Sequence, residues 1–236
     1  MPKSLRILVV VAAVAVPCLL LWQRIFGSFL FTFSIPLLWQ VGVRGEPVSS
    51  LGLQRKSLWP SVITGIISGV IIALISGQLL RLLGIKGFAL SDAQKLELSL
   101  GFLTLNFPLQ EELSYVLLTR SNSLRGVIFY LFSSAFLIGL GEELFWRGFI
   151  QQKFARRLSN NLAIWITAAL FGLTHFYVFT ILPVKEGVMV MAAVAVIGAI
   201  WGYLFTRFNN IWGPAVCHGI IAFTVWKYYF FQSALK

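Results

Sequence analysis

The chain has 236 residues, of which 58% are hydrophobic and only 11% are charged, and its mean hydropathy is +0.85. A soluble domain carries roughly 25% charged residues, so this composition excludes an ordinary soluble protein. It predicts an all-α, polytopic transmembrane helical bundle, and the length fits a single integral-membrane domain over residues 1–236. The net charge of +11 comes from Lys and Arg scattered between apolar runs. We therefore interpret it as contact with the anionic surface of the lipid bilayer and not as nucleic-acid binding.

The first apolar run, Ile7–Trp22, follows Lys3 and Arg6, a pattern shared by signal peptides and first membrane spans. No small-x-small cleavage site follows this run, and a second apolar run, Ile25–Val43, begins almost immediately. We therefore predict that Ile7–Trp22 is retained as the first span and that Ile25–Val43 is the second.

A third span is predicted at Leu58–Leu83, after a polar connection over residues 44–57. This connection ends close to the basic pair Arg55 and Lys56, which is expected to lie at a membrane surface. The span also carries small side chains that would let another helix approach closely, namely Gly65, Ser68 and Gly69.

The segment Ile85–Arg125 is too interrupted to be predicted as an ordinary span. Gly101–Thr119 is partly apolar, but Pro108 and the acidic pair Glu111-Glu112 break the run. We predict an interfacial or re-entrant helix here, with an eighth full span as the alternative. Neither glutamate has an Arg four residues later, so we interpret this pair as facing solvent.

Four further spans complete a bundle of seven to eight: Val127–Lys153, Leu162–Leu182, Val188–Phe208 and Ala215–Phe231. With the N-terminus in the cytoplasm, ten Lys and Arg residues outside the ambiguous segment, Arg147 among them, lie on the cytoplasmic side and four on the other. Because cytoplasmic loops are enriched in Lys and Arg, this distribution predicts a multi-pass protein of the cell membrane with a cytoplasmic N-terminus.

Two adjacent carboxylates, Glu142 and Glu143, lie towards the end of the fourth span. Carboxylates at membrane depth are costly unless a partner compensates them. Glu143 and Arg147 are four residues apart and can pair on one side of a helix, whereas a turn of about 100° per residue directs Glu142 elsewhere. Two interpretations stay open here: a catalytic or metal-binding carboxylate, or a structural Glu–Arg pair beside a second Glu at the water interface.

The two histidines, His175 and His218, are the only ones in the chain. If the fourth and fifth spans fold back at Asn160, Glu142 lies 18 residues before the turn and His175 lies 15 after it. At about 1.5 Å per residue, both lie roughly 22–27 Å from the turn. His218 enters the same layer from the last span, eight residues after Asn210. We therefore predict a shared polar site rather than two isolated core histidines.

Such a site suits the activation of water. A carboxylate and imidazoles can bind a water directly, with Glu as general base, or hold a divalent metal such as Zn²⁺ through Glu142, His175 and His218. We expect water to be the nucleophile, because no Ser or Cys stands beside a base in this region. The two cysteines lie singly in apolar runs and indicate neither a disulfide nor a thiolate zinc site.

The ordered set Glu142-Glu143-x-x-x-Arg147, Phe171-x-x-x-His175 and His218 resembles the CPBP family. This family comprises type II CAAX prenyl proteases and bacteriocin-processing membrane proteases and is also called the Abi family. The resemblance covers a protease-like core over residues 127–231. It implies an intramembrane endopeptidase, a metalloprotease in type, that cleaves near the cytoplasmic membrane face. Its substrate would be a peptide or protein that is prenylated or otherwise membrane-associated.

The resemblance also assigns roles to the site residues. Glu142 and His175 would activate the hydrolytic water, Glu143 and Arg147 would support them, and His218 would complete the site.

One position departs from the family pattern, in which Asn or Asp usually follows the last His by four residues. Here that position is Ala222. The departure favours a second hypothesis, a catalytically weak membrane scaffold or immunity protein. A small transporter is a third hypothesis, but neither inverted repeats nor charges spread along several spans support it.

Overall fold

The computed structural model describes residues 35–82, 96–99, 104–107, 139–180 and 183–225. Several predictions fall outside these residues: the first span, most of the second, the acidic pair Glu111-Glu112 and the larger part of the segment Ile85–Arg125. Apart from one hairpin, the elements of the described residues are helices. The helical fold class is therefore confirmed, while the count of seven to eight spans stays a prediction.

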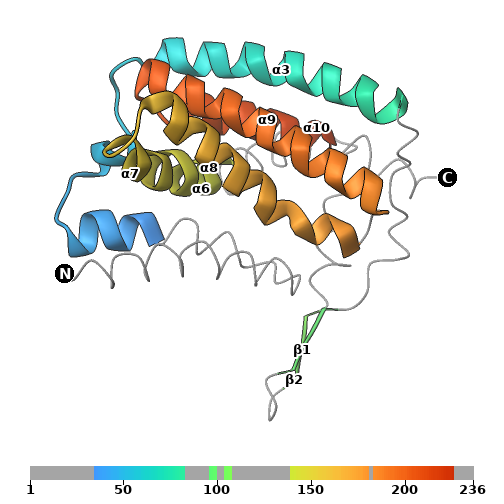
Figure 1. Ribbon diagram of the computed structural model, residues 1–236. Helices are drawn as coiled ribbons and strands as arrows, with labels where there is room; N and C mark the ends of the chain where they lie inside the picture. Colours follow the sequence, from blue (N-terminus) through green and yellow to red (C-terminus); the bar gives the residue numbers. More distant parts are fainter. Residues whose placement is uncertain (1–34, 83–95, 100–103, 108–138, 181–182, 226–236) are drawn as a thin grey trace, which may run out of the picture.

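Ten helical elements lie in the described residues, and the four longest run along the length of the bundle (Figure 1). In chain order they are the π-helix η1 (Leu37–Val43), the 3-10 helix η2 (Val48–Leu51), α3 (Leu58–Leu82), α6 (Gly141–Glu143), the π-helix η5 (Leu144–Gln151), α7 (Gln152–Ala155), α8 (Asn160–Thr174), the 3-10 helix η6 (His175–Thr180), α9 (Val184–Phe208) and α10 (Trp212–Val225).

The exception to the helical pattern is a short hairpin. Strand β1 (Leu96–Ser99) pairs antiparallel with β2 (Thr104–Phe107), and Leu96 lies opposite Phe107. The interfacial or re-entrant helix predicted over Gly101–Thr119 is therefore wrong for Thr104–Phe107. Both strands alternate apolar and polar residues, which is the period of a strand rather than of a helix.

Two of the predicted spans are confirmed as long apolar helices. Within the described residues, Leu58–Leu79 (22 residues) and Val184–Phe208 (25 residues) are long and apolar enough to cross a membrane. The span predicted at Leu162–Leu182 is not one α-helix, because α8 ends at Thr174. The hydroxyl of Thr174 and the imidazole of His175 both bond to the carbonyl of Phe171, at 2.7 and 3.0 Å. Such local side-chain bonds compete with helix continuation.

The small face predicted on α3 packs against α10. A Cβ added to Gly65 would lie 2.3 Å from the backbone oxygen of Gly213, and one added to Gly69 would lie 3.2 Å from the backbone of Cys217. The opposite face of α3 exposes large apolar side chains, as a lipid-facing surface requires: Ile63, Ile66, Ile67, Val70, Ile71, Leu74 and Ile75.

One end of the bundle is closed by the connection over residues 44–57. Leu51 is fully buried in the core, and Gly52 adopts a left-handed conformation (φ +84°). The amide of Ile211 donates to the carbonyl of Gly52 at 3.1 Å. Asn210 donates to the carbonyls of Gln54 and Lys56 at 2.8 and 3.0 Å. This connection is thereby fixed to the turn that precedes α10.

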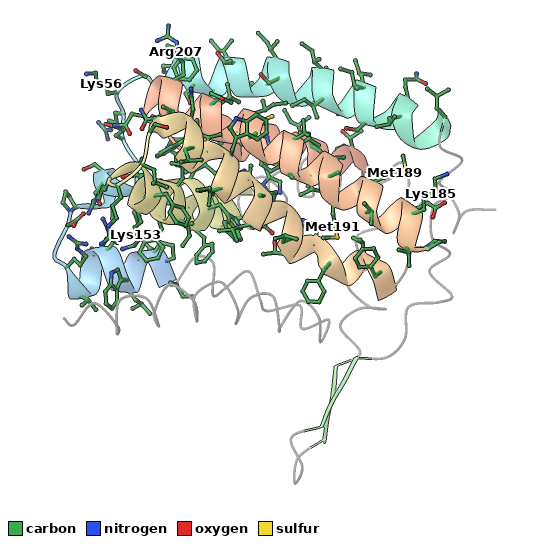
Figure 2. The ribbon with its side chains drawn as sticks, in the orientation of Figure 1. Lys56, Lys153, Lys185, Met189, Met191 and Arg207 are labelled. Atoms are coloured by element: carbon green, nitrogen blue, oxygen red, sulfur yellow. The ribbon has the colours of Figure 1, made fainter. Side chains whose placement is uncertain are left out.

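Basic side chains gather at the closed end. Figure 2 shows Lys56, Lys153 and Arg207 at this end and Lys185 at the opposite end. One assignment in the charge count is wrong, because Arg147 is fully buried beside Glu143 and does not face a membrane surface. Without Arg147, nine Lys and Arg residues lie on the predicted cytoplasmic side and four on the other. This excess still favours the predicted orientation.

Candidate active site

The predicted ion pair between Glu143 and Arg147 is present, and both side chains are fully buried. Nη1 of Arg147 donates to Oε1 of Glu143 at 3.0 Å, and Nη2 donates to the carbonyl of Gly198 on α9 at 2.8 Å. Breaking a buried pair of this kind leaves an uncompensated charge, which is strongly unfavourable. The pair therefore fixes α6 and η5 against α9.

Two aromatic rings enclose the guanidinium of Arg147. Its central carbon lies 4.9 Å from the ring centroid of Phe171 and 5.2 Å from that of Trp201. Rings at these distances attract a cation through their negative faces. The charge of Arg147 is thus held by a carboxylate, a carbonyl and two aromatic rings.

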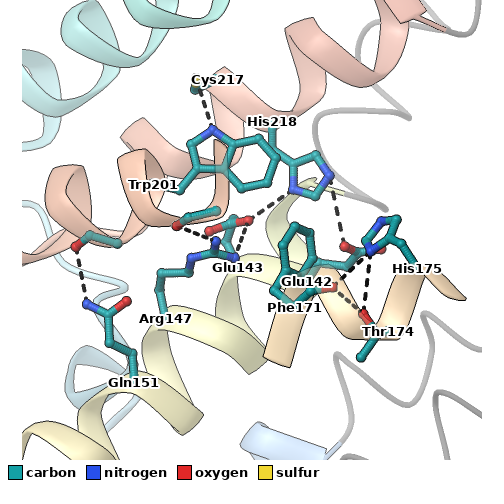
Figure 3. Close-up of polar contacts among 12 residues, drawn as sticks. Glu142, Glu143, Arg147, Gln151, Phe171, Thr174, His175, Trp201, Cys217 and His218 are labelled. Atoms are coloured by element: carbon teal, nitrogen blue, oxygen red, sulfur yellow. Dashed lines mark hydrogen bonds and ion pairs between the residues drawn. The ribbon is translucent and has the colours of Figure 1, made fainter. Parts of the chain in front are cut away.

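The imidazole of His218 faces both carboxylates of the acidic pair (Figure 3). Its Nδ1 lies 3.0 Å from Oε1 of Glu143, and its Nε2 lies 3.9 Å from Oε2 of Glu142. The predicted approach of His218 to Glu142 from a different helix is therefore present. Glu142 points away from Arg147, as the helical turn between adjacent residues predicts.

The contacts of the two histidines indicate where each neutral ring carries its proton. Nδ1 of His175 faces the carbonyl of Phe171, and Nδ1 of His218 faces a carboxylate. Because such oxygens only accept hydrogen bonds, Nδ1 must be the donor in each ring. In a neutral imidazole Nε2 then carries the lone pair. In each ring Nε2 is therefore the hydrogen-bond acceptor, and it points away from the oxygen that Nδ1 contacts.

His175 lies at the C-terminal cap of α8 and reaches the site beside Phe171. The ring of Phe171 lies 4.8 Å from that of His175 and 6.2 Å from that of His218, centroid to centroid, and meets both edge to face. Glu143 and His218 thus meet at hydrogen-bond distance, and Glu142 faces His218 at 3.9 Å. His175 joins the same cluster through a shared aromatic neighbour.

Two residues beside the site were not singled out from the sequence. Trp201 stacks on His218, with centroids 4.1 Å apart and planes 16° from parallel. Gln151 donates to the carbonyl of Gly202 and to the hydroxyl of Thr206, at 3.2 and 3.1 Å. In the sequence, Gln151 could have been found as a polar residue within an apolar run, four residues after Arg147. No signal marked Trp201, because its stacking partner lies on another helix.

Thr224 and Asn210, two polar residues on either side of Ala222 in the sequence, bond to backbone carbonyls elsewhere. The hydroxyl of Thr224 donates to the carbonyl of Ile220 on its own helix at 2.8 Å. The amide of Asn210 is bonded to the connection that closes the bundle end. Both residues therefore have structural partners of their own.

A metal site with three protein ligands is not formed by the described residues. Carboxylate oxygen and imidazole nitrogen are suitable donors for Zn²⁺. Among the described residues, however, no group of three His, Cys, Asp or Glu side chains lies close enough together to hold a metal ion. Glu142 and His218 supply two facing donors, and the three-ligand set with His175 stays a prediction.

Comparison with known families gives one match. The model of a family described as type II CAAX prenyl endopeptidase Rce1-like matches residues 124–224, which include every candidate site residue discussed above. The family resemblance derived from the acidic pair and the two histidines is thereby confirmed over this stretch. No curated protein and no solved structure matches the chain.

Proposed function

We propose that this chain, whose residues 124–224 match the model of a family described as type II CAAX prenyl endopeptidase Rce1-like, hydrolyses a peptide bond within or beside the membrane. The observation that carries the proposal is the 3.9 Å separation between Oε2 of Glu142 and Nε2 of His218. This distance is longer than a hydrogen bond, and it lets both atoms contact one bridging water.

The two glutamates differ in how exposed their side chains are, and we assign them different roles on this basis. The side chain of Glu142 is 20% exposed, whereas that of Glu143 is completely buried. Only Glu142 is therefore accessible to water and to a substrate. Glu143 accepts from Nδ1–H of His218 and from Arg147, and so it orients the imidazole instead of reacting.

The proposed step is direct hydrolysis. Glu142 removes a proton from the bound water as its oxygen attacks the scissile carbonyl carbon. The carbon–nitrogen bond then breaks, and the same proton passes to the leaving amine nitrogen. General-base catalysis of this kind contributes roughly 10²- to 10⁴-fold to a rate. We propose that Nε2 of His175 accepts a hydrogen bond from the water or the incoming substrate.

The proposed substrate is a membrane-associated peptide or protein, and a prenylated C-terminus is one form that fits the family description. The basic residues at the closed end of the bundle support a cytoplasmic location for this end. We therefore propose that cleavage occurs near the cytoplasmic membrane face, in the cell membrane.

Metal assistance is a separate proposal. A Zn²⁺ ion bound by Glu142 and the two histidines would polarise the scissile carbonyl or acidify water. The measurement is zinc content of the purified wild type and of His175→Ala, together with activity before and after chelation. Stoichiometric zinc that is lost with His175 would support the metal. A metal-poor wild type that stays fully active in chelator would contradict it.

The activity is tested with purified protein in detergent or liposomes and a fluorogenic prenylated peptide, with the unprenylated peptide alongside. We expect cleavage by the wild type and at least about a hundred-fold loss in both Glu142→Ala and His175→Ala. Unchanged turnover in both variants would exclude these residues from catalysis.

The alternative is a catalytically weak member that acts as a scaffold or immunity protein, and Ala222 is the observation that favours it. Ala222→Asn restores the usual family residue one helical turn after His218. If the chain is a weakened enzyme, this variant should gain hydrolysis over an inactive wild type. If the wild type already cleaves the peptide, the scaffold alternative fails.

A further inference from the structure

The indole ring of Trp201 stacks on one face of the imidazole ring of His218. It lies on α9, is only 3% exposed, and stacks face to face on the imidazole at 4.1 Å between centroids. The 16° angle between the planes makes this the one nearly parallel ring pair among the described site residues. Figure 3 shows the indole beside the imidazole of His218, and Phe171 meets both rings edge to face.

The orientation of Trp201 is itself fixed. Its Nε1–H donates to the sulfur of Cys217 at 3.1 Å, and Cys217 immediately precedes His218 on α10. Its ring also meets Phe171 edge to face at 5.8 Å. A buried Trp that satisfies its N–H in this way has little freedom to rotate. Trp201 therefore ties α9 to the turn of α10 that carries His218.

The hydrogen bond from Nδ1 of His218 to Glu143 fixes one point of the imidazole but leaves its plane free to tilt. Stacking on the indole fixes the plane. The two restraints together determine where Nε2 points, and in the structure it points at Glu142. We propose that Trp201 is a positioning residue that holds the His218 ring in the plane required for the hydrolysis proposed above, on which this inference rests.

The kinetic test compares Trp201→Leu and Trp201→Phe in the peptide assay. We expect Trp201→Leu to lower kcat by roughly ten- to a hundred-fold with little change in KM, because misplacement of a reacting group affects the chemical step. Trp201→Phe keeps an aromatic face and should recover most of the loss. The matched control is Phe205→Leu, a buried ring one turn further along α9 that packs against Gly52. Its kcat should stay within about three-fold of wild type.

A spectroscopic test does not depend on activity. With only two histidines in the chain, selectively labelled protein in micelles gives two sets of imidazole signals, which His175→Gln assigns. We expect the ring protons of His218 to be shifted upfield by the indole and to show cross-relaxation to it. Trp201→Leu should abolish the upfield shift, Trp201→Phe should keep most of it, and Phe205→Leu should leave it unchanged. If the leucine variant does not fold, Trp201→Met is used instead.

The outcomes separate this inference from the proposed function. A wild type in which His218 shows no upfield shift and no cross-relaxation to Trp201 overturns the inference, whatever the variants do. An unchanged kcat in a folded Trp201→Leu variant also overturns it. If the stacking signature is present but neither the wild type nor Ala222→Asn cleaves any peptide, the proposed function fails while the geometry of Trp201 stands.

Discussion

At the scale of single residues, the site is organised by one imidazole that faces two carboxylates of different exposure. His218 donates to the buried Glu143 and turns its other nitrogen towards the partly exposed Glu142. Arg147 balances the charge of Glu143 from the opposite side. A buried carboxylate is tolerated only with such partners. Glu142 is the more exposed of the two carboxylates, and we therefore propose it as the one that meets a substrate.

The buried pair should be essential for folding. Arg147→Met keeps a long side chain but leaves Glu143 buried without its cationic partner. We expect the free energy of unfolding to fall by about 3–5 kcal/mol, measured by denaturation in mixed micelles. Adding Glu143→Gln removes the unpaired charge and should recover part of this loss. A single variant as stable as the wild type would contradict the assigned role of the pair.

Part of this site could be predicted from residue types and spacing. The four-residue interval between Glu143 and Arg147 predicted their pairing, and matched depth predicted the approach of His218 to Glu142. The charge count wrongly placed Arg147 at the cytoplasmic surface, because several other basic residues follow it in the sequence. Trp201 could not be found, because stacking between α9 and α10 leaves no local pattern.

At the scale of elements, close contact between α3 and α10 holds the helix that carries His218. The two helices meet at glycines, with Gly65 opposite Gly213, and the hydroxyl of Ser61 accepts from the amide of Gly213 at 3.0 Å. In a bilayer, where lipid is as apolar as Leu, small residues that allow close packing are the main source of helix association.

Gly65→Ala should force α3 away from α10. The added Cβ would lie 2.3 Å from the backbone oxygen of Gly213, which cannot yield as a flexible side chain can. Overpacking of this kind costs about 1–3 kcal/mol. We expect a lower midpoint of unfolding and weaker peptidase activity. The matched control is Gly42→Ala, whose Cβ meets nothing within 4 Å. Equal behaviour of the two variants would contradict the assigned contact.

The sequence was a better guide to long helices than to their ends. The apolar runs that became α3 and α9 were predicted almost to their limits. The end of α8 was missed, because hydropathy does not show that Thr174 and His175 bond back to the carbonyl of Phe171. Strand β2 was missed because the apolar content of Gly101–Thr119 outweighed its short alternating pattern.

At the scale of the whole molecule, the bundle has one strongly basic end. Connections around Lys56, Lys153 and Arg207 meet there, while Lys185 lies at the other end (Figure 2). Positive loops are retained on the cytoplasmic side. A single domain over residues 1–236 and a cytoplasmic N-terminus stay predictions.

The orientation can be measured by labelling single cysteines in intact cells. Cys217 is buried, so Cys18→Ser is the only background change needed. We expect a membrane-impermeant maleimide to label Lys185→Cys in intact cells, and to label Arg156→Cys only after permeabilisation. The reverse pattern would place the basic end outside the cell and contradict the predicted topology.

The peptide turnover of Glu142→Gln shows whether this carboxylate is the catalytic base, because the change is of nearly equal size and removes only the base. Glu186→Gln, near the start of α9 at the opposite end, is the matched control. We predict that Glu142→Gln keeps the wild-type unfolding midpoint and loses at least about a hundred-fold in kcat, while Glu186→Gln keeps full activity. Wild-type turnover by folded Glu142→Gln would contradict a hydrolytic site built on this carboxylate.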